Sequence, residues 1–132
     1  MKKILFVCVE NAGRSQMAEA FAKKYGGDEV EVYSAGTMPH SQVHPEVIEV
    51  MKEKGFDLLN KKPKMLDQKM LAEADVVITM GCTSEELCPA PLVKNVEDWR
   101  IEDPKGKPLE RVRAIRDQIE QKVLELLNRL KS

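Results

Sequence analysis

Apolar positions along this chain follow two spacings, which predict buried strands and amphipathic helices in alternation. A continuous apolar run at residues 4–7 predicts a buried strand. Apolar residues three or four positions apart predict helices, most clearly in the stripe that runs through residues 109–130. In chain order we predict a strand at 3–7, a helix at 15–25, a strand at 30–33, helices at 44–54 and 67–73, strands at 76–80 and 93–96, and a long helix at 109–130.

Turn-forming and capping residues bound several of these elements. Gly26-Gly27 is expected to end the first helix. His44-Pro45 is expected to open the second, because proline suits the first turn of a helix, and Gly55 to end it. Ser34-Ala35-Gly36 predicts a turn that closes the second strand.

Strands that alternate with helices predict an α/β fold. We expect residues 1–132 to form a single, doubly wound domain with a central, mostly parallel four-stranded sheet flanked by helices. Right-handed crossovers place the carboxyl ends of parallel strands at one edge of the sheet, where ligands bind. Cys8, the predicted turn at 34–36, Cys82 and the stretch after Val96 all follow strands, so we expect them to converge at this edge.

Composition narrows the class of protein. The 132 residues are 42% hydrophobic and 33% charged, with a formal net charge of −1, so no basic excess points to a nucleic-acid partner. The apolar stretches are too short to span a bilayer and the N-terminus lacks a signal-peptide core, so we expect a cytoplasmic monomer without a membrane partner. Three cysteines in a reducing compartment fit one nucleophile plus a pair better than a structural disulfide framework.

The segment from Cys8 to Ser15 carries the candidate chemistry. It joins the first strand to the first helix, and such a loop aims backbone N–H groups and the positive end of a helix at one point. Arg14 adds a planar fork that suits a tetrahedral oxyanion, and Cys8 at the mouth of this cradle is favoured as a thiolate. The residues expected to bind the oxyanion are Glu10, Asn11, Ala12, Gly13, Arg14 and Ser15.

Each part of this loop also has a purely structural interpretation. A single cysteine at the end of a strand is often a small buried hydrophobe, and a single arginine is often a solvated surface charge. The Cys-x5-Arg spacing alone is weak, but its strand–loop–helix context favours a nucleophilic thiol. Ser15 is suited to donate its hydroxyl to the thiolate, and Asn11 to hold the backbone of the loop.

A second group of candidate residues comes later in the chain. If Cys82 and Cys88 lay on a helix they would be about 9 Å apart along its axis, whereas a disulfide needs Cα atoms closer than about 7 Å. Oxidation of this pair would therefore unwind the segment. Buried thiols without a role are an alternative, whereas zinc is disfavoured because the spacing lacks a short Cys-x2-Cys knuckle. Asp103 precedes a proline that stiffens its loop, which suits either a turn or a general acid held over the cradle.

With these residues in this order, the chain resembles the arsenate reductases that have the low-molecular-weight tyrosine phosphatase fold and are recharged by thioredoxin. The resemblance runs nearly end to end. It rests on residues 11–19, Tyr33-Ser34-Ala35-Gly36-Thr37, His44-Pro45, Asp75-Val76-Val77, the pair Cys82 and Cys88, and the stretch from Asp98-Trp99 to Asp103-Pro104.

The resemblance implies a three-cysteine relay that reduces arsenate to arsenite. Cys8 attacks the arsenic of a bound arsenate while Asp103 protonates the departing oxygen. Cys82 then attacks the Cys8 sulfur, which releases arsenite, and Cys88 resolves that disulfide. The resulting Cys82–Cys88 disulfide is reduced by thioredoxin or a similar protein. The catalytic residues implied are Cys8, Arg14, Ser15, Cys82, Cys88 and Asp103.

The chain departs from its relatives in ways that bear on cofactors and on alternative functions. Some relatives hold a potassium ion with residues that match Asn11, Glu19 and Ser34 plus an aspartate, where this chain has Lys64, so we expect no metal ion or other cofactor. A tyrosine phosphatase is the nearest alternative, although such enzymes commonly carry an aromatic residue where this chain has Lys105. A non-catalytic thiol redox sensor is the second alternative.

Overall fold

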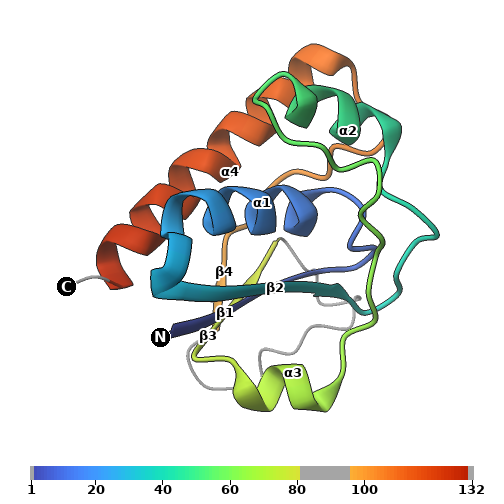
Figure 1. The fold of residues 1–132 in the computed structure, drawn as a ribbon. Coiled ribbons are helices and arrows are strands. Elements are labelled where there is room, and N and C mark those ends of the chain that lie inside the picture. The colour runs from blue at the N-terminus through green and yellow to red at the C-terminus, as the bar shows by residue number, and fades with distance from the viewer. Residues whose placement is uncertain (1, 81–95, 131–132) are drawn as a thin grey trace.

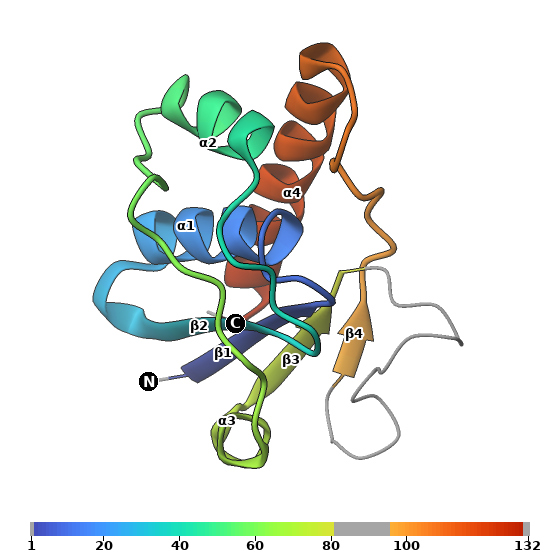
Figure 2. The same cartoon turned by 90° about the vertical axis from the view of Figure 1, so that its right-hand side faces the viewer.

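The computed structural model describes residues 2–80 and 96–130. Its central sheet has four parallel strands in the order β2-β1-β3-β4, formed by β1 (Lys2–Cys8), β2 (Val30–Gly36), β3 (Val76–Thr79) and β4 (Val96–Asp98). Figure 2 shows these strands side by side, with their carboxyl ends toward one edge. The predicted parallel α/β sheet is thus confirmed.

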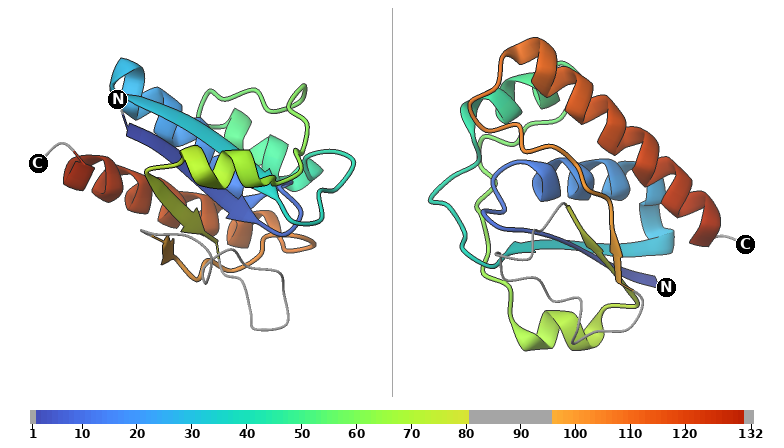
Figure 3. Two further views of the ribbon diagram at one scale, coloured as in Figure 1. Left: turned by 90° about the horizontal axis from the view of Figure 1, so that it is seen from below. Right: turned by 180° about the vertical axis from the view of Figure 1, so that it is seen from behind.

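Helices cover both faces of the sheet (Figure 1). On one face lie α1 (Arg14–Gly26), α2 (Pro45–Lys52) and the long α4 (Leu109–Leu130), while the short α3 (Gln68–Glu73) lies on the other. A short 3₁₀ turn at Gly27–Glu29 joins α1 to β2. In Figure 3, the view from below has α3 in front of the sheet, and the view from behind has α4 running diagonally above the sheet.

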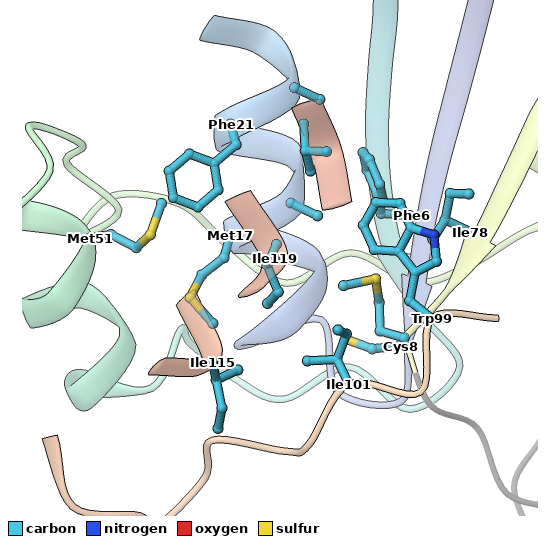
Figure 4. Packing of buried hydrophobic residues seen from close by; sticks show 14 of the residues in the cluster. Phe6, Cys8, Met17, Phe21, Met51, Ile78, Trp99, Ile101, Ile115 and Ile119 are labelled. Carbon is cyan, nitrogen blue, oxygen red and sulfur yellow. The ribbon is translucent and has the colours of Figure 1, made fainter. Parts of the chain in front are cut away.

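The alternation of side chains along β1 explains why its apolar run is continuous. Ile4, Phe6 and Cys8 belong to the larger core under α1, α2 and α4, whereas Leu5 and Val7 belong to the smaller core under α3. A strand buried on both faces needs apolar residues at every position. Figure 4 shows the larger core, in which Trp99 and Ile101 pack close to Cys8.

Three predicted boundaries differ from the structure by two or more residues. The predicted turn at 34–36 is wrong, because Phe6, Val7 and Cys8 pair with Ser34, Ala35 and Gly36 and extend β2. Helix α2 ends at Lys52, before the predicted position 54, and Gly55 follows it with φ of 88°. Strand β4 runs to Asp98, beyond the predicted end at 96, because it pairs with the carboxyl end of β3; positions 93–95 lie outside the described residues.

Within residues 2–80 and 96–130, no helix is long and apolar enough to cross a membrane. The predicted bounds of the last helix, 109–130, are confirmed.

Candidate active site

The loop between β1 and α1 (residues 9–13, the cysteine loop) is held in place by hydrogen bonds to its carbonyl groups and to that of Cys8. Four of them accept hydrogen bonds from N–H groups in the segment between β2 and α2. The pairs, donor first, are Thr37 to Cys8 (3.3 Å), Met38 to Val9 (2.8 Å), His40 to Glu10 (2.9 Å) and His44 to Ala12 (2.9 Å). In a planar trans peptide the N–H group points opposite to the C=O group. The N–H groups of the same peptides are therefore turned toward the inside of the loop, as an anion cradle requires.

The Cys8 sulfur lies inside this loop and has two hydrogen-bond partners. The Asn11 backbone N–H donates to Cys8 Sγ at 3.2 Å, and the Ser15 hydroxyl lies 2.8 Å from the same sulfur. Asn11 reaches this position with φ of 51°, a left-handed conformation that asparagine tolerates better than most residues. Donors directed at the sulfur stabilise a thiolate, which is the nucleophilic form of cysteine.

The side chain of Asn11 determines which way the Ser15 hydroxyl points. Its Oδ1 atom accepts from the backbone N–H of Lys64 at 2.9 Å and from Gln16 Nε2 at 3.1 Å. Its Nδ2 atom must therefore donate, and it does so to Ser15 Oγ at 2.7 Å. Because the Ser15 oxygen accepts that hydrogen bond, its own proton is free to point at Cys8.

Arg14 is anchored at one of its nitrogen atoms. Its Nη1 atom donates to the backbone oxygen of Met80 at 2.5 Å and to that of Ile101 at 2.8 Å. These carbonyl groups follow β3 and β4, so the sheet topology positions the guanidinium. Arg14 also lines the cavity above Cys8, and a guanidinium held at one nitrogen offers its remaining N–H groups to an oxyanion.

A cavity of about 320 Å³ opens above the loop, at the small end of the range for ligand pockets. It brings Cys8 and Arg14, from the two ends of this loop, together with Asp103, which lies far from them in the sequence. The Asp103 carboxylate accepts from the backbone N–H of Lys105 at 3.0 Å through Oδ1. Its position in the cavity wall suits a group that delivers a proton to a bound oxyanion.

The predicted oxyanion residues divide into two groups. Glu10, Ala12 and Gly13 line the cavity with Cys8 and Arg14. Asn11 and Ser15 are fully buried and contact the Cys8 sulfur instead.

Besides Val9, which lies in the loop between β1 and α1, two further residues of the cavity wall, Met38 and His44, were not predicted from the sequence. His44 does precede α2 with Pro45 at its first turn, as predicted, but it also lines the cavity. The only signal in the sequence was that both residues follow the strand adjacent to β1 and hence lie near the same edge of the sheet.

Behind the loop, Lys64 lies beside Glu19, one of the residues that the resemblance linked to a potassium ion. Its ammonium group lies 3.7 Å from Glu19 Oε1, which accepts a hydrogen bond from the Ser34 hydroxyl at 2.9 Å. Lys23 lies 3.3 Å from the other oxygen of the buried Glu19 carboxylate. Two lysines thus balance Glu19, and the Asn11 Oδ1 atom already accepts two hydrogen bonds. These residues do not fit an additional potassium ion.

The predicted redox pair, Cys82 and Cys88, lies outside the described residues. Among the residues that the structure does describe, no group of three or more histidine, cysteine or acidic side chains is arranged to hold a metal ion.

Strand β1 leads into the cysteine loop and then into α1, and Cys8, Arg14 and Asp103 share one cavity. This arrangement is that of an enzyme that attacks oxyanions with a thiol. The chain belongs to the low molecular weight phosphotyrosine protein phosphatase family, whose pattern matches residues 3–132.

Similar proteins include arsenate reductases. The chain is 46% identical to a putative arsenate reductase of Halobacterium salinarum over 131 residues, which cover 96% of this chain and 91% of the relative. A solved arsenate reductase in a phosphate-binding state is 38% identical, covers 98% of both chains and superposes with a TM-score of 0.86. A thioredoxin-dependent arsenate reductase of Corynebacterium glutamicum is 37% identical with a TM-score of 0.82, over 99% of this chain and 62% of that one.

Proposed function

We propose that this protein reduces arsenate to arsenite with electrons from thioredoxin or a thioredoxin-like protein. One observation carries the proposal: Cys8 lies in an anion cradle together with Arg14 and Asp103, in a chain that also contains Cys82 and Cys88. The arsenate reductase relatives support arsenate as the oxyanion, and the Corynebacterium glutamicum relative supports the reductant.

The first step forms a bond between Cys8 and arsenic. Arsenate lies against the N–H groups of the loop and the Arg14 guanidinium, which balance its charge. The Cys8 thiolate attacks arsenic, an As–O bond breaks, and Asp103 supplies a proton so that the oxygen leaves as water. Ser15, which donates to the sulfur, stabilises the thiolate before attack.

The next steps transfer two electrons to arsenic. Cys82 attacks the Cys8 sulfur, the S–As electron pair stays with arsenic, and arsenite leaves with arsenic in the trivalent state. Cys88 then attacks Cys82, which releases the Cys8 thiolate and leaves a Cys82–Cys88 disulfide. Thioredoxin reduces this disulfide by ordinary thiol exchange. One arsenate is reduced for each dithiol oxidised.

The test is arsenate-dependent NADPH oxidation with thioredoxin and thioredoxin reductase. Sustained turnover by the unmodified protein, and its loss in Cys8→Ser, Cys82→Ser and Cys88→Ser, are expected. Cys82→Ser should still bind arsenate, and normal turnover by this variant would overturn the relay. If the cysteines of the protein are oxidised once and no turnover follows, the protein is a thiol sensor instead.

A phosphatase is the second candidate, because Cys8, Arg14 and Asp103 would serve the cleavage of a phosphate ester equally well. Rapid hydrolysis of p-nitrophenyl phosphate that needs these three residues but neither Cys82 nor Cys88, without arsenate turnover, would favour it.

We further propose that residues 1–132 act as one domain, as a monomer in the cytoplasm and without a nucleic-acid or membrane partner. Light scattering of the purified protein tests the oligomeric state, and cell fractionation tests the location.

A further inference from the structure

An acidic side chain lines the anion cavity, which is unexpected because a carboxylate repels a bound oxyanion. Glu10 belongs to the cysteine loop and lines the cavity together with Cys8 and Arg14. Its side chain is 27% exposed, whereas Cys8 is 4% exposed. Glu10 therefore lies toward the open mouth of the cavity, above the buried sulfur.

Three cationic or ionisable side chains surround the Glu10 carboxylate. His40 Nδ1 lies 3.5 Å from Oε2, while His44 Nε2 and Lys105 Nζ lie 3.7 and 3.5 Å from Oε1. The histidines come from the segment between β2 and α2, and Lys105 comes from the segment between β4 and α4 that carries Asp103. Glu10 thus connects two segments that both contribute to the cavity wall.

The Asp103 segment is held against the cysteine loop at a second point. A Cβ atom on Gly13 would lie 3.2 Å from Pro104 Cγ, so Pro104 packs directly on the loop. The backbone N–H of Lys105 donates to Asp103, and its side chain reaches Glu10. These contacts bring the Lys105 side chain to Glu10 beside the proposed general acid: Glu10 lines the cavity, and Lys105 contacts Glu10 from outside the lining.

We propose that the Glu10–Lys105 ion pair, supported by His40, determines specificity by narrowing the mouth of the cavity around an inorganic oxyanion. A compact tetrahedral ion lies on the cradle beneath the pair. The organic group of an ester extends outward, and it enters only if Glu10 and Lys105 separate. This inference rests on the proposed function, since it takes the Cys8 cavity to be the substrate pocket, and it adds the substrate class: free inorganic oxyanions rather than aryl esters.

The expected size of the effect is modest. Lys105 and His40 are 54% and 42% exposed in their side chains, and exposed ion pairs are individually weak and screened by salt. Because His40 contacts the same carboxylate as Lys105, we expect the two contacts together to change the relative affinity for small and large ligands by about fivefold.

The test compares two ligands with the same head group. Methylphosphonate and phenylphosphonate are titrated for protection of Cys8 against iodoacetamide, with the Cys8 peptide quantified by mass spectrometry. We expect methylphosphonate to protect the unmodified protein at a concentration about tenfold lower than phenylphosphonate does. In Glu10→Gln and Lys105→Ala this ratio should fall about fivefold. A general loss of anion attraction would weaken both ligands equally and leave the ratio unchanged.

Lys107→Ala is the matched control, because Lys107 lies in the same segment but pairs with Glu102 at 3.8 Å rather than with a residue of the cavity lining. It should keep the ratio of the unmodified protein. A second measurement needs no variant: the ratio should also fall in about 1 M salt, where the screening length is about 3 Å.

Equal protection by both phosphonates in the unmodified protein, or an unchanged ratio in both variants, would overturn the proposal. If neither ligand protects Cys8, the cavity is not an anion site and the proposal fails as well. Arsenate turnover is measured separately, so its absence would overturn the proposed function without altering the phosphonate ratio.

Discussion

The hydroxyl of Ser15 lies 2.8 Å from the sulfur of Cys8 and is oriented toward it by the side-chain amide of Asn11. Ser15 and Asn11 are both buried. The hydrogen bonds form a chain in which the Lys64 backbone N–H donates to Asn11, Asn11 donates to Ser15, and Ser15 donates to the sulfur. A serine that can only donate to the thiolate is a fixed dipole in the ground state, so it needs no reorganisation when the sulfur becomes the nucleophile.

Ser15→Ala should slow the reaction of Cys8 with iodoacetamide at neutral pH by about tenfold to a hundredfold. A hydrogen bond to a charged group contributes about 1.5–3 kcal/mol, and this one is lost in the variant. The folded protein is alkylated, and the rate is obtained by quantifying the Cys8 peptide by mass spectrometry after proteolysis. Ser41→Ala, a change at an exposed serine of the segment between β2 and α2, should react like the unmodified protein. Equal rates in both variants would mean that Ser15 does not stabilise the thiolate.

The activity and the melting temperature of the protein should be the same in potassium and in sodium, because Lys64 supplies a positive charge behind the loop. Its ammonium group lies 3.7 Å from the buried Glu19 carboxylate. Lys64→Asp places a second carboxylate there, which should lower the free energy of unfolding by about 1–2 kcal/mol and make the melting temperature rise with potassium. Lys62→Asp, with the same charge change at an exposed position, should show no preference between the ions. A strong activation of the unmodified protein by potassium would contradict this prediction.

Gly36→Ala should disturb the cysteine loop. A Cβ atom there would lie 2.5 Å from the Val9 carbonyl oxygen and 2.9 Å from the Asn11 backbone nitrogen, and backbone atoms cannot move aside as a flexible side chain can. We expect a loss of about 1–3 kcal/mol in urea unfolding together with weaker protection of Cys8 by phosphate. Gly106→Ala, which has φ of 72° and no atom near the added Cβ, should lose stability but keep the protection.

Glu53 should contribute to stability at neutral pH and lose that contribution in acid. Hydrogen bonds from Arg113, and then from Arg116, hold the pKa of its carboxyl at about 2, below the ordinary 4.5. Because the pKa is lower in the folded than in the unfolded protein, the ion pairs stabilise the fold above about pH 4.5 and are lost as the pH falls toward 2. In urea unfolding, Glu53→Gln should be less stable than the unmodified protein at pH 7, and the difference should shrink below pH 4.5.

The control for this pH dependence is Asp28→Asn, which changes an exposed carboxylate in the turn before β2. Its difference from the unmodified protein should stay nearly constant over the same pH range. A Glu53→Gln difference that does not depend on pH would show that the contacts between α2 and α4 act through packing alone.

The local chemistry and the strongly periodic helices could be predicted from neighbouring residues in the sequence. Cys8, Arg14 and Ser15 were identified because they lie in one short strand–loop–helix segment, whose geometry follows from neighbouring residues. The helix at Leu109–Leu130 was predicted to its exact ends, since its apolar stripe is long and regular. The strand–loop–helix segment and the apolar stripe are both local patterns, and a local pattern indicates which face of one element is buried.

The sequence predicted that the loops after the strands meet at one edge of the sheet, but the side chains that contact one another there are seen only in the folded protein. Strand β2 continues to Gly36 because β1 offers it backbone partners, which no pattern at 34–36 reveals. The anchoring of Arg14 on Met80 and Ile101, and the meeting of Glu10 with His40 and Lys105, depend on the loops that the sheet gathers at one edge. Periodicity reports that a residue is buried, whereas its partner is selected by strand order and by the packing of whole elements.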